Sequence, residues 1–345
     1  MATRFIDKAG ALADIRNLPN AAGIGFFNGR FYGNFNGSVA PLTGGNPFGG
    51  VLLVDGDNGS DTDTRLPYAT IQAAVTAASA GDTIYVKALD MASGASDPVN
   101  YAETIIIPAG KSRLSIIGIG GGPAQGNLPQ IKIGAGTTAM LDVRSPGCTI
   151  ANLGFNGASS TGGGIVLTDD GGTTNAAFGT VITGCHFKNC KAHATNSKLG
   201  GAIYWPADGG AWQVLIANNR FYGNVGSISL VGTSGSAPKD VVIDGNYFGA
   251  DVETAVDSYI YGAGGSGFVD MTITNNIFAT DKPAIGSGSV ALYMDLTGVN
   301  VGIVANNYFA TADGAVFGAT GTDALVPTTV LLVANYDEGG SFTRT

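Results

Sequence analysis

The chain has little cysteine, little charge and no long apolar run. Only 12% of its 345 residues are charged, and the three cysteines, Cys148, Cys185 and Cys190, form an odd and sparse set. With His186 between two of them they match no zinc-binding spacing well, so we expect reduced, partly buried thiols. No stretch reaches the apolar length of a membrane span, and residues 1–5 lack the charged-then-apolar layout of a signal peptide. We therefore expect no membrane partner and no export by that route.

The charge that is present is unevenly placed. The chain has a formal net charge of −9, made up of +2 in residues 1–50 and −11 in the rest. A body this acidic argues against nucleic acid as a partner. Its 55 glycines and 44% hydrophobic residues fit a structure with a large core and many corners.

One pattern recurs through the second half of the chain. It consists of an apolar β-former, a variable residue, a position with Asn or Gly, a position that is usually Asn, an aromatic or long residue, and Phe. The example Ile216–Phe221 reads Ile-Ala-Asn-Asn-Arg-Phe. Copies end at Phe155, Phe187, Phe221, Phe248, Phe278 and Phe309, with steps of 32, 34, 27, 30 and 31 residues, and a degenerate copy ends at Asp337. A period of this length indicates a stacked repeat architecture.

Each repeat holds two or three short strand-like runs separated by glycine-rich corners. The runs 241–243 and 271–274 are β-branched and too short for helices, and further apolar runs such as 227–231 and 290–294 lie between copies. Leucine-rich and helical repeats do not fit this composition. We therefore predict an all-β chain that forms a parallel β-helix, or solenoid.

Two columns of side chains follow from stacking the repeats. The first column holds Asn at a corner, where we expect the left-handed backbone conformation and amides bonded along the axis, and Cys185 takes one position of it. The second column holds Phe stacked inside the coil. The predicted structural ladder comprises Asn219, Asn246, Asn276, Asn307, Asn335, Phe155, Phe187, Phe221, Phe248, Phe278 and Phe309.

The start of the coil carries a family resemblance. A strand at 51–54 and an acidic loop at 55–64 come first and are followed by Pro-Tyr-Ala-Thr-Ile-Gln-Ala-Ala. The Ala-rich stretch 69–78, which begins inside this segment, has an apolar helical face. Ala-Gly-Asp-Thr-Ile-Tyr-Val and then Tyr-Ala-Glu-Thr-Ile come next. This order resembles the N-terminal cap of right-handed parallel β-helix proteins of the pectate-lyase-like superfamily, of the kind found in phage virion knobs and spikes. The resemblance covers residues 51 to about 340. It implies a right-handed coil with a short capping helix over its open end, and no particular activity.

The sequence suggests two regions. Residues 1–50 form an extended N-terminal arm or attachment segment, and residues 51–345 form the β-helix domain, with 51–90 as its cap. The arm has too many aromatic residues for a free tail, so we expect it to fold over its own coil or to dock on another subunit. Its expected attachment residues are Phe26, Phe27, Arg30, Phe31, Tyr32 and Phe35.

No catalytic column appears when the repeats are aligned. Asp244 falls in register with Thr274 and Ala305, and Arg220 with Tyr247, so no arrangement of acids with a base emerges. The weak catalytic candidates are the loop acids Asp251, Glu253 and Asp257, any two of which would act as a glycosidase pair if about 5 to 10 Å apart. For metals, we expect no cofactor and keep calcium as a low-ranked candidate at Asp55, Asp57, Asp61 and Asp63, whose alternate spacing lacks the Gly and distal Glu of an EF-hand.

Three functions remain open, and the sequence leans away from an enzyme. The first is a phage virion structural protein located in the virion, a trimeric capsid decoration (cement) knob anchored by its arm to the major capsid protein or another virion subunit. The second is a tailspike or depolymerase that binds or cleaves host surface polysaccharide. Its candidates for stacking on sugar rings are Tyr204, Trp205, Trp212, Tyr259, Tyr261 and Tyr293, and the alternative is that half of them pack inward. The third is a cellular β-helix polysaccharide lyase, glycoside hydrolase or adhesin. Threefold association is what the resemblance to phage β-helices implies.

Overall fold

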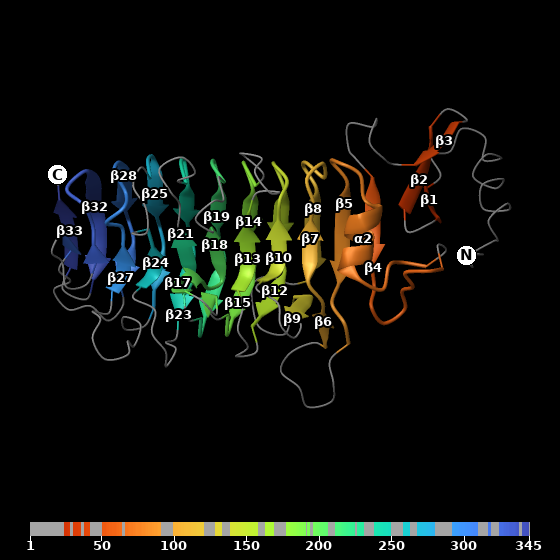
Figure 1. The fold of residues 1–345 in the computed structure, drawn as a ribbon, viewed down its shortest axis with the longest axis horizontal. Helices are drawn as coiled ribbons and strands as arrows, with labels where there is room; N and C mark the ends of the chain where they lie inside the picture. The colour runs from red at the N-terminus through yellow and green to blue at the C-terminus, as the bar shows by residue number, and fades with distance from the viewer. Residues whose placement is uncertain are drawn as a thin grey trace.

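The fold is a parallel β-helix in which the chain winds through three ladders of short strands (Figure 1). The computed structural model describes residues 24–27, 30–35, 38–41, 50–63, 66–90, 99–120, 128–132, 139–157, 163–168, 177–190, 192–193, 196–205, 211–224, 226–230, 238–249, 258–262, 268–279, 292–309, 317–318, 324–337 and 340–344. In these ranges no helix has the length and apolar character needed to cross a membrane. The predicted all-β solenoid is confirmed.

The ladders run along the whole coil, each strand pairing in parallel with its counterpart one repeat away. The first ladder is β4 (Val51–Val54), β5 (Thr83–Lys87), β8 (Ser115–Ile119), β11 (Thr149–Ala151), β14 (Val181–Thr183), β19 (Leu215–Ala217), β22 (Val242–Asp244), β25 (Met271–Thr274), β28 (Gly302–Ala305) and β32 (Val330–Asp337). The second is β6 (Asn100–Ala102), β9 (Gln130–Lys132), β12 (Gly154–Asn156), β15 (His186–Lys188), β20 (Arg220–Tyr222), β23 (Tyr247–Gly249), β26 (Ile277–Phe278), β29 (Tyr308–Phe309) and the end of β32. The third is β7 (Ile105–Ile107), β10 (Ala139–Val143), β13 (Gly163–Leu167), β18 (Ile203–Trp205), β21 (Ile228–Leu230), β24 (Ser258–Tyr261), β27 (Leu292–Asp295), β31 (Ala324–Leu325) and β30 (Phe317–Gly318).

The core is built from the columns that the repeat predicts. The rings from Phe155 to Phe309 stack one per coil, with neighbouring centroids 4.7 to 5.0 Å apart and nearly parallel planes. The side-chain amide of Asn246 donates to Asn276 Oδ1 at 3.0 Å, and its own Oδ1 accepts from the Asn219 amide at 3.1 Å. The same bonds continue through Asn307 to Asn335, so buried amides are satisfied along the axis.

The expectation that the ladder asparagines take the left-handed backbone conformation is wrong, because that conformation occurs one residue earlier. The left-handed residue is the one just before the ladder, as at Asn218, Asn275 and Asn306, each with φ of 56°. Gly245 takes the same place in its coil with φ of 64°. The ladder asparagine therefore follows the corner, with its side chain turned inward. Cys185 does occupy a ladder position, because its N–H donates to Asn219 Oδ1 at 2.9 Å.

A helix covers the start of the coil. Helix α2 (Ile71–Ala77) lies within the predicted range and buries Ile71, Ala74 and Val75 against the first strands. The Thr70 hydroxyl caps its first turn by accepting from the Ala73 N–H at 3.2 Å. At its other end the Lys111 ammonium donates to the Thr76 carbonyl at 3.0 Å and to that of Ala78. The capping helix expected from the sequence is confirmed.

Antiparallel strands adjoin the coil at three places. At the start, β1 (Ile24–Phe27), β2 (Arg30–Phe35) and β3 (Ser38–Pro41) form an antiparallel sheet, and β2 pairs with β4 through Arg30 and Leu52. At the other end β33 (Gly340–Arg344) folds back on β32. A hairpin of β16 (Ala192–His193) and β17 (Asn196–Gly200) interrupts the chain between β15 and β18. The arm strands therefore adjoin one end of a rod whose last strands form the opposite end (Figure 1).

Candidate functional site

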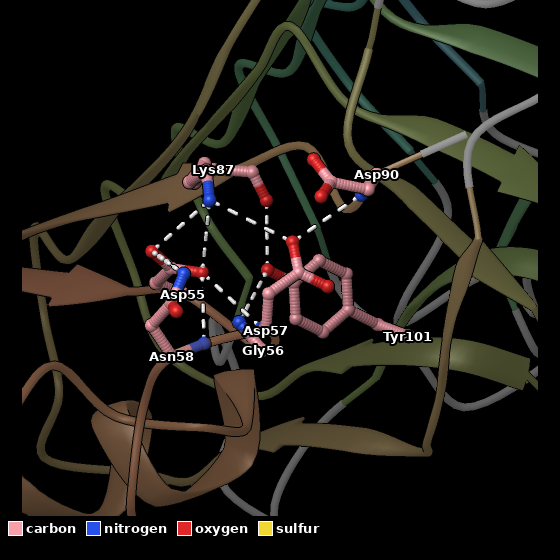
Figure 2. A network of polar contacts seen from close by, with 7 residues as sticks. All are labelled: Asp55, Gly56, Asp57, Asn58, Lys87, Asp90 and Tyr101. Atoms are coloured by element: carbon pink, nitrogen blue, oxygen red, sulfur yellow. Dashed lines mark hydrogen bonds and ion pairs between the residues drawn. The ribbon is translucent and has the colours of Figure 1, made fainter. Parts of the chain in front are cut away.

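A cluster of ionisable groups lies on the cap, where the acidic loop after β4 meets the end of β5 (Figure 2). Asp55 directly follows β4, and Lys87 is the last residue of β5, so parallel pairing of these strands brings the two side chains to the same edge. The Lys87 ammonium lies 3.1 and 3.2 Å from the two carboxylate oxygens of Asp55 and 3.6 Å from Asp57 Oδ2. Lys87 therefore neutralises part of the negative charge of the acidic loop.

Backbone and phenol groups complete this network. Asp55 Oδ1 accepts from the N–H groups of Asp57 and Asn58 at 3.2 and 3.3 Å, the pattern of an Asx turn. The Tyr101 hydroxyl donates to the Lys87 carbonyl at 2.7 Å and accepts from the Gly56 N–H at 3.2 Å. The Asp90 N–H donates to Asp57 Oδ2 at 3.3 Å. The loop, the first two coils and the second ladder are thus tied together.

The protonation states of these groups follow from their contacts. Partial burial acts to raise the pKa of Asp55, but hydrogen bonds from Lys87 and Asn58 outweigh it and hold the pKa below its usual value. The bond to Asp55 raises the pKa of Lys87, and burial raises the pKa of Tyr101 to about 12. At neutral pH the network is therefore a carboxylate, an ammonium and a neutral phenol, which suits a fixed ion pair better than proton transfer.

The four aspartates considered for calcium do not converge on one site. Asp55 and Asp57 face Lys87, whereas Asp61 accepts from the Ala69 and Thr70 N–H groups at 2.8 and 3.1 Å, just before α2. The Asp63 N–H donates to the Ser60 hydroxyl at 2.9 Å. In the described part of the chain, no group of three or more His, Cys, Asp or Glu side chains is placed to hold a metal ion.

The remaining predicted site residues are placed as follows. Asp251, Glu253 and Asp257 lie outside the described residues. The six arm residues belong to β1 and β2, whose backbone alone is described. The three cysteines are buried and unpaired, and burial raises the pKa of each to about 12.

The aromatics expected to stack on sugars are mostly internal, which corrects that expectation. Trp205 and Tyr293 are 0% and 1% exposed, and Tyr204, Tyr259 and Tyr261 are also buried. Trp212 is only partly buried, but its ring lies 4.8 Å from the Lys239 ammonium. Strands β18 and β24 of the third ladder are buried on both faces, so the alternation of residues along them does not show which side chains face the core.

Sequence reasoning missed one ion pair on the third ladder. Asp142 in β10 binds Arg144 through Nε at 2.8 Å and through Nη2 at 2.5 Å. The Thr168 hydroxyl, just after the neighbouring strand β13, donates to the other Asp142 oxygen. The available signal was an Asp in a strand-like run with an Arg two residues later, which directly follows β10. This group holds a single carboxylate, whereas a glycosidase pair needs two.

No family model matches the chain, and no curated protein does. Among solved structures, a rhamnogalacturonan lyase is similar over 84% of this chain and 74% of its own, at 13% identity and a TM-score of 0.39. A protein of Geobacillus virus E2, ORF18, is similar over 90% of this chain and 68% of its own, also at 13% identity, with a TM-score of 0.38. The chain is a parallel β-helix protein on the evidence of its own strand register.

Proposed function

We propose that the protein is a virion structural component, a trimeric decoration knob fixed to a phage capsid through residues 1–50. The observation that carries the proposal is the difference between the two ends of the rod. The arm strands β1 to β3 adjoin the first coil through the Arg30 and Leu52 pairing, and the coil extends away from them (Figure 1). Such a molecule presents one end for attachment and projects the other.

The ionisable groups of the cap agree with this function. The Asp55 and Lys87 pair joins two successive coils, and Glu103 and Lys111 hold the two ends of α2. Each group is engaged in holding the cap on the coil, next to the arm. A rigid junction between arm and rod is what a projecting knob requires.

A stripe on the outer side of the first ladder supports association of identical subunits. It is formed by side chains that lie in register on successive strands and are partly exposed, Leu331 the most at 42%. These are Val181, Leu215, Val242, Ile303 and Leu331, with Thr272 between the third and fourth. A flat aliphatic stripe parallel to the rod axis fits burial against a neighbouring copy around a threefold axis.

The test combines a mass measurement with binding to isolated phage heads. The wild-type protein should have the mass of a trimer and should co-sediment with heads. Replacing Phe31 and Tyr32 in β2 by Ser should abolish co-sedimentation at unchanged mass, whereas Leu215→Lys should reduce the mass to that of a monomer. The matched control is Tyr85→Ala, an exposed residue of β5 outside the arm and the stripe. A monomeric wild-type protein that does not bind heads would contradict the proposal.

A further inference from the structure

The contacts of a threefold trimer join two different surfaces of the subunit. In a closed ring of three identical copies each contact is heterologous, because one patch of a copy meets another patch of the next. Given the trimer of the proposed function, on which this inference rests, the aliphatic stripe of the first ladder needs a partner surface elsewhere on the rod. The second and third ladders are the two faces that could supply it.

The outer row of the third ladder is already covered by its own chain. Successive strands place in one register the side chains of Val166, Tyr204, Ser229 and Tyr261. These four side chains are only 3% to 7% exposed. They are therefore not available to a neighbouring copy.

The second ladder presents an open row of large side chains. One register on β23, β26, β29 and β32 holds Tyr247, Ile277, Tyr308 and Tyr336, which we call the tyrosine row. Its last three members are 42% to 46% exposed. The same coils carry the stripe residues Val242, Thr272, Ile303 and Leu331. Rotation about an axis parallel to the rod keeps each coil at its own height, so a row residue of one copy would face a stripe residue of the next.

One cation and one carboxylate border these surfaces at the same level of the rod. The Arg220 guanidinium lies 4.6 Å from the centre of the Tyr247 ring, which belongs to the next coil. Asp244 stands on the outer side of the first ladder in that coil, three residues before Tyr247. The two opposite charges thus lie at one height on two adjoining faces of the rod.

These two charges have no ion-pair partner within the described part of the chain, where no salt bridge includes Arg220 or Asp244. Asp244 accepts from the Thr274 hydroxyl at 2.6 Å and from the Asn275 amide at 2.7 Å, and both bonds end on Oδ1. The bonds orient the carboxylate and leave Oδ2 for a donor from another copy. A guanidinium is well suited to that position.

The corner between the two faces is neutral in the described coils. Its left-handed position is filled by Asn152, Gly184, Asn218, Gly245, Asn275, Asn306 and Ala334. Three equivalent side chains approach one another at a threefold axis, so charged residues there would repel their own copies. An amide can both donate and accept, so asparagines tolerate that position.

We infer that the aliphatic stripe of one copy packs on the tyrosine row of the next, and that Arg220 of the second copy binds Asp244 of the first. The neutral corner then lies along the threefold axis. The three rods are parallel, so their three arms lie at the same end of the particle. The proposed attachment to a capsid uses that end.

The experiment measures the mass of the full-length protein by sedimentation over a range of concentrations, which gives the midpoint of trimer dissociation. Tyr308→Lys places a charge in the contact and should raise the midpoint concentration at least about tenfold. Ile106→Lys is the matched control, because it adds the same charge at a 37% exposed position of the third ladder and should leave the midpoint unchanged. Both variants should keep the far-ultraviolet circular dichroism of the wild type.

A double-mutant cycle tests the charge pair. Arg220→Gln removes the cation, and Asp244→Asn removes the carboxylate charge while keeping an oxygen that accepts from Thr274 and Asn275. Each variant alone should raise the midpoint about tenfold, and the two together should raise it no further.

The outcomes separate this inference from the proposed function. A trimeric wild type that is unaffected by Tyr308→Lys, or a cycle with absent or additive effects, would overturn the inference and leave the trimer standing. A wild type that stays monomeric at every concentration would contradict the trimer of the proposed function as well.

Discussion

Glu103 and Ile71 are 32 residues apart in the sequence and are joined by a hydrogen bond of 2.9 Å from the Ile71 N–H to Glu103 Oε1. The other carboxylate oxygen accepts from the Gln72 N–H, also at 2.9 Å. One side chain of the second coil thus satisfies two free N–H groups in the first turn of α2. We expect Glu103→Ala to lower the free energy of unfolding by about 1 to 3 kcal/mol, measured by chemical denaturation. A change below about 0.5 kcal/mol would show that water replaces the carboxylate.

The same residue gives a pH-dependent prediction. Burial raises the pKa of Glu103 above its ordinary value of 4.5, despite the two hydrogen bonds. The folded protein then holds this proton more tightly than the unfolded chain, so the associated stability is complete below pH 4.5 and is lost as pH rises through the folded pKa. Relative to Glu103→Gln, which does not titrate, the wild type should lose stability as the pH rises above 4.5. Parallel pH profiles of the two proteins would refute this.

Replacing a single asparagine of the ladder should lower the stability of the protein. The side chain of Asn276 donates to the Ile243 carbonyl and to Asn307, and its Oδ1 accepts from the N–H and the amide of Asn246. Asn276→Ala leaves several buried groups unpaired, and we expect a loss of about 3 kcal/mol. Asn306→Gly is the matched control, because this corner residue of the next coil is exposed and glycine accepts its positive φ. Denaturant midpoints of the two variants compare the positions, and equal losses would contradict the role of the ladder.

The phenylalanine stack should show the usual cost of removing a core ring. Phe221 lies between the rings of Phe187 and Phe248, at centroid distances of 5.0 and 4.9 Å. Phe221→Ala should lower stability by about 3 to 5 kcal/mol. The adjacent Tyr222→Ala faces solvent and should change it by less than about 1 kcal/mol. Thermal unfolding of both variants tests the assignment of inward and outward faces.

The thiols should be inert in the folded protein. Cys148, Cys185 and Cys190 are buried, and burial raises the pKa of each to about 12, so almost no thiolate exists at pH 8. We expect no reaction with a thiol-specific reagent in native buffer and three equivalents after denaturation. Rapid labelling of the native protein would show that the coil opens around these residues.

The sequence predicts the repeat register well, because stacking forces equivalent residues onto the same position. Ile216 pairs with Ile243, and Phe221 with Phe248, as the alignment of repeats requires. Predicting the columns of Asn and Phe required only this register. The predicted register of Asp244 is likewise confirmed, since it pairs with Ala217 on one side and Thr274 on the other.

Contacts outside the repeat could not be predicted in the same way. The bonds from Glu103 to α2 and from Lys87 to Asp55 join residues whose neighbourhood depends on how the cap sits on the coil. The inward placement of Tyr259 depends on both faces of β24 being covered, which a strand's own alternation does not reveal. The pairing of β2 with β4 depends on a chain reversal that no repeat specifies.

The reversed strands at the two ends have a consequence for assembly. The parallel ladder starts at β4 and stops at β32, and each of these strands pairs with an antiparallel neighbour, β2 and β33. A parallel coil has no intrinsic length, because every new turn offers the next one the same edge. In this chain the antiparallel strands β2 and β33 end the parallel ladder, so they set the length of the coil. Without the reversals, the edge strand of one rod would match that of another, so we expect the reversals to oppose end-to-end joining of rods into filaments.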